Sequence, residues 1–115
     1  MKKLSVFLIS LISIVSFPSA SIAGCNTSNA FSCTDITIDR FYPDSDGLYI
    51  DTSGNETKLK CTPTSEKYLR LSITNKNYNL ISNVLLKAHE SRHPIWVRVN
   101  DDSNKCEIIY VVSDR

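Results

Sequence analysis

Residues 68–99 read YLRLSITNKNYNLISNVLLKAHESRHPIWVRV, and their hydrophobic pattern changes period twice. The stretch begins with alternation, in which every second residue is apolar: Leu69, Leu71 and Ile73. Apolar residues then recur at helical spacing: Tyr78, Ile81, Leu85 and Ala88. After Pro94 the alternation returns with Ile95, Val97 and Val99. Because alternation is typical of half-buried strands and the longer period of amphipathic helices, the stretch predicts a strand, a helix and a strand.

The sequence on either side of this stretch predicts further strands. Residues 35–39 alternate in polarity, residues 43–47 are rich in turn formers, and residues 48–52 form a second apolar segment. This arrangement predicts a β-hairpin. Beyond the stretch, the turn-forming residues 100–104 precede the apolar segment 106–112, which is typical of a strand buried on both faces or lying at an interface.

The predicted order is therefore β-β-β-α-β-β. Residues 58–61 are a candidate for one more short strand, whereas residues 24–34 are polar, lack a period and are expected to form an arm. A mainly β chain with one central helix after its third long strand predicts a small oligosaccharide-binding (OB) barrel. A helix packed on a β-meander is the alternative architecture.

The first residues are typical of a secretory signal peptide. Two lysines precede an apolar run at 4–17, and small residues lead up to Ala23. We expect residues 1–23 to be removed on export and residues 24–115 to form a single domain, secreted through the periplasm. The pattern that ends at Cys25 also fits a bacterial lipoprotein, so lipidation of this cysteine is an alternative.

The four cysteines are Cys25, Cys33, Cys61 and Cys106. An even number in an exported protein suits two disulfides, and lipidation of Cys25 would leave an odd thiol. Four cysteines permit three pairings. Among them we predict Cys25–Cys33, which closes a short polar loop, and Cys61–Cys106, which ties the segment before the third long strand to the last strand.

Composition and motifs disfavour nucleic-acid binding and enzymatic activity. Loss of Lys2 and Lys3 leaves 11 basic and 12 acidic residues, so no basic footprint for nucleic acid is expected. Residues 89–93 read HESRH, which matches the zinc-protease pattern H-E-x-x-H, but Pro94 disfavours helix at the second histidine. A triad assembled from Ser91 and His89 lacks a nucleophile-elbow motif. We expect no catalytic residue, no metal and no cofactor.

Three features together resemble the B (delivery) subunits of pertussis-like bacterial toxins, such as those of typhoid toxin and subtilase cytotoxin. Residues 29–32, NAFS, resemble the aromatic-serine segment before the first strand of that family. Residues 93–99, HPIWVRV, resemble the turn and strand that follow its helix. The predicted order of strands and helix also fits over most of the exported chain.

The resemblance implies a ring-shaped pentamer of OB folds that binds sialylated or related host-cell glycans and carries a catalytic A subunit. It implies that Ser32 hydrogen-bonds the sugar acid beside Phe31, and that Asp51 and Thr52 line the pocket. Hydroxyl, amide and aromatic groups are also the types that read sugars, which adds Asn29 to the candidates. Because residues 24–34 are expected to form a polar arm, replacement of Ser32 should change the stability of the protein little.

The chain departs from the family in three respects. Val99 stands where one relative has a pocket aromatic residue, no cysteine occurs at 49–51, and the cysteine-rich C-terminal extension is missing. The resemblance therefore does not determine which glycan is bound, and the disulfide pairing is expected to differ from that of the family. A stand-alone secreted or lipidated envelope adhesin or inhibitor is the alternative function.

The apolar surface also predicts self-association. Leu86 lies off the main apolar stripe of the predicted helix, and residues 108–112, IIYVV, are apolar at both alternating sets of positions. A small domain with such a strand can protect it by pairing with a neighbouring copy. We therefore expect a homo-oligomer, and the resemblance makes the expected number five.

Overall fold

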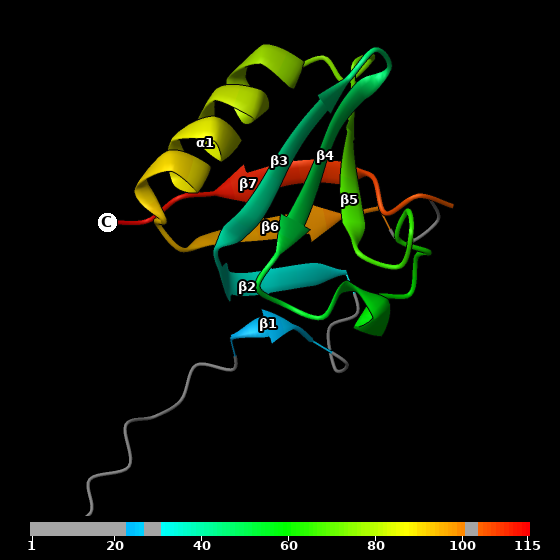
Figure 1. Ribbon diagram of the computed structural model, residues 1–115, viewed down its shortest axis with the longest axis horizontal. Helices are drawn as coiled ribbons and strands as arrows, with labels where there is room; N and C mark the ends of the chain where they lie inside the picture. The colour runs from blue at the N-terminus through cyan, green and yellow to red at the C-terminus, as the bar shows by residue number, and fades with distance from the viewer. Residues whose placement is uncertain (1–22, 27–30, 101–103) are drawn as a thin grey trace, which may run out of the picture.

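The computed structural model describes residues 23–26, 31–100 and 104–115 (Figure 1). Within these residues, seven strands form two antiparallel sheets, and one α-helix packs against both. The first sheet has the order β1-β2-β6-β7, with bounds Gly24–Cys25, Ser32–Ile36, Ile95–Val99 and Ile108–Val112. The second has the order β3-β4-β5, with bounds Ile38–Asp44, Gly47–Thr52 and Tyr68–Ser72. The mainly β class is confirmed.

The predicted hairpin is formed by β3 and β4. Its register pairs Tyr42 with Tyr49 and Asp44 with Gly47, so the turn contains the remaining two residues, Ser45 and Asp46. Gly47 is required here because a Cβ atom at this position would overlap the carbonyl oxygen of Leu71 on β5. The glycine therefore lets the middle strand of the second sheet approach its neighbour closely.

The segment predicted as a single strand at 35–39 is divided between the two sheets. Ile36 and Ile38 are both buried, as the alternation predicts, but Thr37 between them ends β2 and precedes β3. Asp35 has a left-handed backbone with φ 48°, and the register of β2 against β6 shifts in the same place. This irregularity bends the chain, so that one run of sequence contributes to both sheets.

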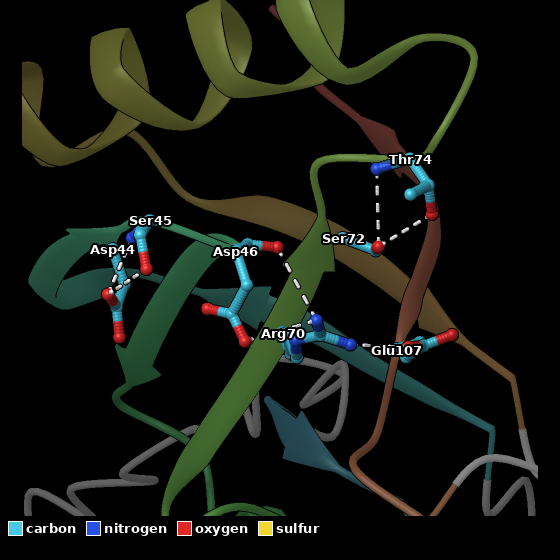
Figure 2. Close-up of polar contacts among 7 residues, drawn as sticks. All are labelled: Asp44, Ser45, Asp46, Arg70, Ser72, Thr74 and Glu107. Atoms are coloured by element: carbon cyan, nitrogen blue, oxygen red, sulfur yellow. Dashed lines mark hydrogen bonds and ion pairs between the residues drawn. The ribbon is translucent and has the colours of Figure 1, made fainter.

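The sheets also meet where β5 approaches the start of β7. The backbone N–H of Arg70 donates to the Cys106 carbonyl at 3.1 Å, and Arg70 forms a parallel bridge with Glu107. The Arg70 guanidinium reaches Glu107 Oε1 at 2.7 Å and Asp46 Oδ2 at 3.5 Å (Figure 2). This is a single bridge rather than a continuous ladder, so the two sheets are not closed and the predicted OB barrel is not confirmed.

The helix α1 spans Tyr78–Ser91 and packs on β3, β5 and β7 (Figure 1). Its inward side chains join both sheets in one core: Ile81, Leu85 and Ala88. Arg92 ends the helix in the left-handed region with φ 53°, as expected from the proline two residues later. Asn77 occupies the N-cap without a side-chain cap bond, and its N–H donates to Asn75 Oδ1 at 2.9 Å.

Three sequence predictions need correction. Residues 58–61 do not form a strand, because a 3-10 helix at Glu56–Lys58 leads into bends there. Ile73 is 53% exposed, since β5 ends at Ser72 and its alternation stops. Of the two alternatives for the last strand, burial on both faces is wrong, because β7 lies at a sheet edge and Ile109 is 48% exposed; a position at an interface stays a prediction.

Both disulfides join the predicted partners, Cys25–Cys33 and Cys61–Cys106. Cys25 and Cys33 are direct Cα partners in the β1–β2 ladder, so the first bond cross-links adjacent strands. The second bond fastens the segment after β4 to the start of β7. All four cysteines are buried and belong to the core.

Candidate functional site

Ser32 lies in a different environment from the one that the sequence predicts. It begins β2, is only 1% exposed and is the Cα partner of Arg98 on β6. The expected polar arm is wrong at this point, because residues 24–25 pair with residues 33–34 as strands and the first disulfide joins them. Asn29, the other predicted polar residue of this segment, lies outside the described residues.

Phe31 is half-buried at the start of β2. Its carbonyl oxygen accepts a hydrogen bond of 2.7 Å from the N–H of Val99, which fixes the residue against the end of β6. Two cations approach its ring: Arg98 Cζ lies 5.2 Å from the ring centre, and Lys60 Nζ lies 5.1 Å from it. Both distances are within the range of cation–π attraction.

Strand register extends this cluster across three strands. Ser32, Arg98 and Tyr110 are successive Cα partners on β2, β6 and β7. Directly opposed residues of antiparallel strands share a face of the sheet, so these three belong to the same face. We define the Arg98 site as Phe31, Ser32, Lys60 and Arg98, with Tyr110 at its edge.

The Arg98 site is cationic. Within the part of the chain that the structure describes, no carboxylate lies within 4.0 Å of the charged groups of Lys60 or Arg98. A guanidinium can bind a carboxylate through two parallel hydrogen bonds, and an ammonium adds a point charge. Beside an aromatic ring, these groups suit a ligand that carries both a carboxylate and an apolar face.

Thr52 is buried at the end of β4, and its polar groups bind Glu56. Its N–H and its hydroxyl each donate to Glu56 Oε1 at 2.7 Å. Its Oγ1 accepts a bond of 3.2 Å from the N–H of Gly54. Burial raises the pKa of the Glu56 carboxyl group above its ordinary value. These contacts order the turn after β4 and leave the Thr52 hydroxyl engaged within the protein.

Asp51 lies one residue earlier, half-buried on β4. It is the Cα partner of Arg40 on β3 and of Tyr68 on β5. Asp51 and Thr52 therefore belong to the second sheet, whereas Ser32 begins β2 of the first sheet and Phe31 directly precedes it. The predicted candidates thus belong to different sheets.

Sequence reasoning missed Lys60, Arg98 and Tyr110. Arg98 lies within the HPIWVRV segment, and the alternation of this segment places its side chain on the face opposite to the buried Val97 and Val99. The sequence therefore contained the information needed to predict that Arg98 lies on the outer face. Lys60 follows the 3-10 helix in an irregular segment beside Cys61, and no periodic pattern indicates its position. Only the folded path of this segment brings it to Phe31.

The two histidines of the HESRH segment hold separate parts of the backbone. His89 Nδ1 lies 2.9 Å from the Ile38 carbonyl oxygen, and its ring stacks on Phe41 with centres 5.8 Å apart. His93, beyond the end of α1, hydrogen-bonds through Nε2 to the Asp114 carbonyl oxygen. Among the described residues, no group of three or more side chains could hold a metal ion.

The chain matches no protein-family model, no curated protein and no solved structure with which it was compared. No helix in the described part of the chain has the length and hydrophobicity needed to span a membrane.

Proposed function

We propose that this chain is a glycan-binding delivery subunit of a pertussis-like bacterial toxin and that the Arg98 site binds an acidic sugar. The observation that carries the proposal is the position of the Phe31 ring, which two cations approach at 5.1 and 5.2 Å, and neither cation has a carboxylate within 4.0 Å among the described residues. The resemblance of residues 29–32 and 93–99 to the toxin subunits supplies the biological setting. The residues of the Arg98 site and the segments that resemble the toxin subunits thus involve the same two strands, β2 and β6.

In the proposed complex, the sugar carboxylate binds Arg98 and Lys60, and the apolar face of the sugar packs on Phe31. Charge-assisted hydrogen bonds are about twice as strong as neutral ones, so the two cations supply most of the affinity. Ser32 is buried, and its proposed hydrogen bond with the sugar acid is therefore secondary to the contacts of the cations. A sialic acid is the host-cell sugar class that combines these features.

We also propose that the two sheets form an open variant of the OB barrel. The chain runs from β2 into β3 on one side, and the Arg70–Glu107 bridge links β5 to β7 on the other. With the ladders within the sheets, this gives the circular order β2-β3-β4-β5-β7-β6. Contacts between Arg70 and Glu107 protons in nuclear magnetic resonance spectra would support closure in solution, and free exchange of the Arg70 amide would contradict it.

The proposed ring uses the part of the β7 edge that lies beyond the Arg70–Glu107 bridge, where Ile109 and Tyr110 are exposed. An apolar groove of about 310 Å³ lies between α1 and β7, and its lining includes Leu80, Ile81 and Ile109. Leu80 is 68% exposed, although it is apolar. A neighbouring copy that pairs with β7 would cover this groove and satisfy the strand edge. Five linked sugar sites would gain avidity on a cell surface, and the helices would face a passage for an A subunit.

The disulfides support the proposed export through the periplasm, where such bonds form. Because its thiol is bonded to Cys33, Cys25 is not available for lipidation in this state. Mass spectrometry of the exported chain tests both points. A mass increase of a diacylglycerol group on Cys25 would favour the envelope lipoprotein instead.

A glycan array tests the binding proposal directly. We expect the exported protein to bind sialylated glycans and to bind them more weakly when Phe31→Leu removes the aromatic ring but keeps an apolar side chain. A second variant, Lys60→Gln, should also weaken binding because it removes one of the two cations. Lys58→Gln is its matched control and should bind normally, since both lysines are exposed and lie in the same segment. Equal binding by the Phe31 variant and the native protein would contradict the proposed site.

A further inference from the structure

Three tyrosines from adjacent strands meet on the second sheet. Tyr42 lies on β3, Tyr49 on β4 and Tyr68 on β5. Their ring centres are 5.9 Å apart for Tyr42 and Tyr49, 6.3 Å for Tyr42 and Tyr68, and 6.4 Å for Tyr49 and Tyr68. Each ring therefore contacts the other two, and we call these residues the tyrosine platform.

The hydrophobic core does not account for the platform. Alternation along β4 sends Leu48 and Ile50 inward, and both belong to the core cluster that contains the buried residues of α1. Tyr49 points to the opposite face and is not part of that cluster, although Tyr42 and Tyr68 cover it. Tyr42 itself is 50% exposed. The outward face of a small sheet is ordinarily polar, so three aromatic rings here call for another explanation.

Hydrogen-bonding groups of both kinds border the platform. Arg40 Nη1 donates to the Tyr68 hydroxyl at 3.0 Å, and Lys67 Nζ lies 5.4 Å from the centre of the Tyr68 ring. Asp51 is the Cα partner of both Arg40 and Tyr68, so its carboxylate occupies the same face. Next along β5, the charge of Arg70 is paired with Glu107 and Asp46 (Figure 2).

This surface therefore differs in charge from the Arg98 site. Arginine and lysine donors stand beside an aspartate acceptor, whereas the charged side chains described at the Arg98 site are both cations. Mixed donors and acceptors around exposed rings complement an uncharged ligand with many hydroxyl groups and one apolar face. A nucleic-acid strand would repel Asp51 and would require a phosphate-binding stripe of cations.

We propose that the tyrosine platform is a second sugar site, which binds a neutral hexopyranose through stacking on Tyr42 and hydrogen bonds from Arg40 and to Asp51. The proposal rests on the glycan-binding function, because it assigns the platform to a neutral residue of the same class of ligand. Two sites of different charge on one chain would let it distinguish branched or extended glycans from a lone acidic sugar.

Titration of the exported, disulfide-bonded protein with methyl glycosides of galactose, glucose, mannose and fucose tests this site. We expect at least one of these sugars to shift the ring resonances of Tyr42, Tyr49 and Tyr68 in nuclear magnetic resonance spectra. Tyr42→Ala is expected to weaken that binding about tenfold, since it removes an exposed stacking surface. Ile73→Ala is the matched control, because Ile73 is 53% exposed and lies outside the platform.

The variant Arg98→Gln separates this proposal from the proposed function. It should weaken binding of sialylated glycans by about tenfold or more and leave the titration with neutral sugars unchanged. Failure of sialoglycan binding in the native protein, with the neutral-sugar shifts intact, would contradict the Arg98 site alone. The platform proposal is overturned if none of the four glycosides shifts the tyrosine resonances at saturating concentrations. It is also overturned if Tyr42→Ala changes the oligomeric mass and not sugar binding, which would identify the platform as an interface between copies.

Discussion

The guanidinium carbon of Arg98 lies 5.2 Å from the centre of the Phe31 ring, although 67 positions separate the two residues in the chain. The hydrogen bond from the Val99 N–H to the Phe31 carbonyl fixes this relationship, because it joins the backbone of the two segments. The ring and the cation are therefore positioned before any ligand binds. Such preorganisation lowers the entropic cost of binding.

Arg98→Gln should reduce the affinity for sialylated glycans by about tenfold or more, because a hydrogen bond to a charged group contributes about 1.5 to 3 kcal/mol. The fold should persist, since Arg98 forms no salt bridge within the described residues. Calorimetric titration with a sialyllactose measures the effect. Lys60→Gln should show a smaller loss and Lys58→Gln none; equal losses in all three variants would indicate only a general effect of charge.

The variant Ser32→Ala tests whether the Ser32 hydroxyl binds the sugar or serves only the structure of the protein. If the proposed hydrogen bond to the sugar acid exists, the variant should bind up to about tenfold more weakly, a smaller loss than that of Arg98→Gln. Because Ser32 is buried and does not lie in a polar arm, the variant should also show a measurable decrease in Tm. Affinity and thermal unfolding should be measured on the same preparation. A lower Tm with unchanged affinity would remove Ser32 from the sugar site.

Local periodicity predicts the mainly β class and the succession of strand, helix and strand from β5 to β6. The alternation at 69–73 and 95–99 and the helical spacing at 78–88 each correspond to an observed element, because each has one buried face. The irregular backbone of Asp35 and the assignment of β2 and β3 to different sheets were not predictable in this way. They depend on pairing between segments distant in sequence, for which the local pattern holds no signal.

The candidate site was less predictable for the same reason. Phe31 and Ser32 were found through a short resemblance, but the cations come from β6 and from the segment beside Cys61. The disulfide with Cys106 and the core around Leu59 determine where that segment lies. A lysine in an aperiodic segment is indistinguishable in sequence from any other exposed lysine. Its place beside Phe31 emerges only from tertiary structure.

The two disulfides should contribute unequally to stability. The sequence separation is 8 residues for Cys25–Cys33 and 45 for Cys61–Cys106. The chain-entropy model then gives about 2.5 kcal/mol for the first bond and about 4 kcal/mol for the second. Chemical unfolding of the paired alanine variants, Cys25→Ala/Cys33→Ala and Cys61→Ala/Cys106→Ala, measures this order. A larger loss for the first pair would show that the covalent link between β1 and β2 acts mainly on the native state.

Glu56 should make the free energy of unfolding depend on pH. Burial raises the pKa of its carboxyl group in the folded protein above the ordinary value of 4.5. Between that value and the raised pKa, the folded chain holds a proton that the unfolded chain has released, so stability falls as pH rises through this window. Glu56→Gln should remove this part of the dependence, whereas replacement of the exposed Glu66 by Gln should not. Urea unfolding from pH 4 to pH 7 provides the measurement, and superimposable profiles of native and Glu56→Gln protein would contradict it.

Ile109→Asp should dissociate the proposed ring. Ile109 is 48% exposed on the edge strand β7 and lines the apolar groove beside α1. A carboxylate at this position would be buried without a partner only if a second copy of the chain covers the groove. In a monomer the same change faces water and should leave Tm nearly unaltered. Ile73→Asp is the matched control, since Ile73 is 53% exposed and does not line this groove. Light scattering at micromolar concentration should report a pentamer for the native protein and for Ile73→Asp, and smaller species for Ile109→Asp. A native protein that is a stable monomer under these conditions would refute assembly through β7, and the acidic-sugar site would then belong to a stand-alone binding protein.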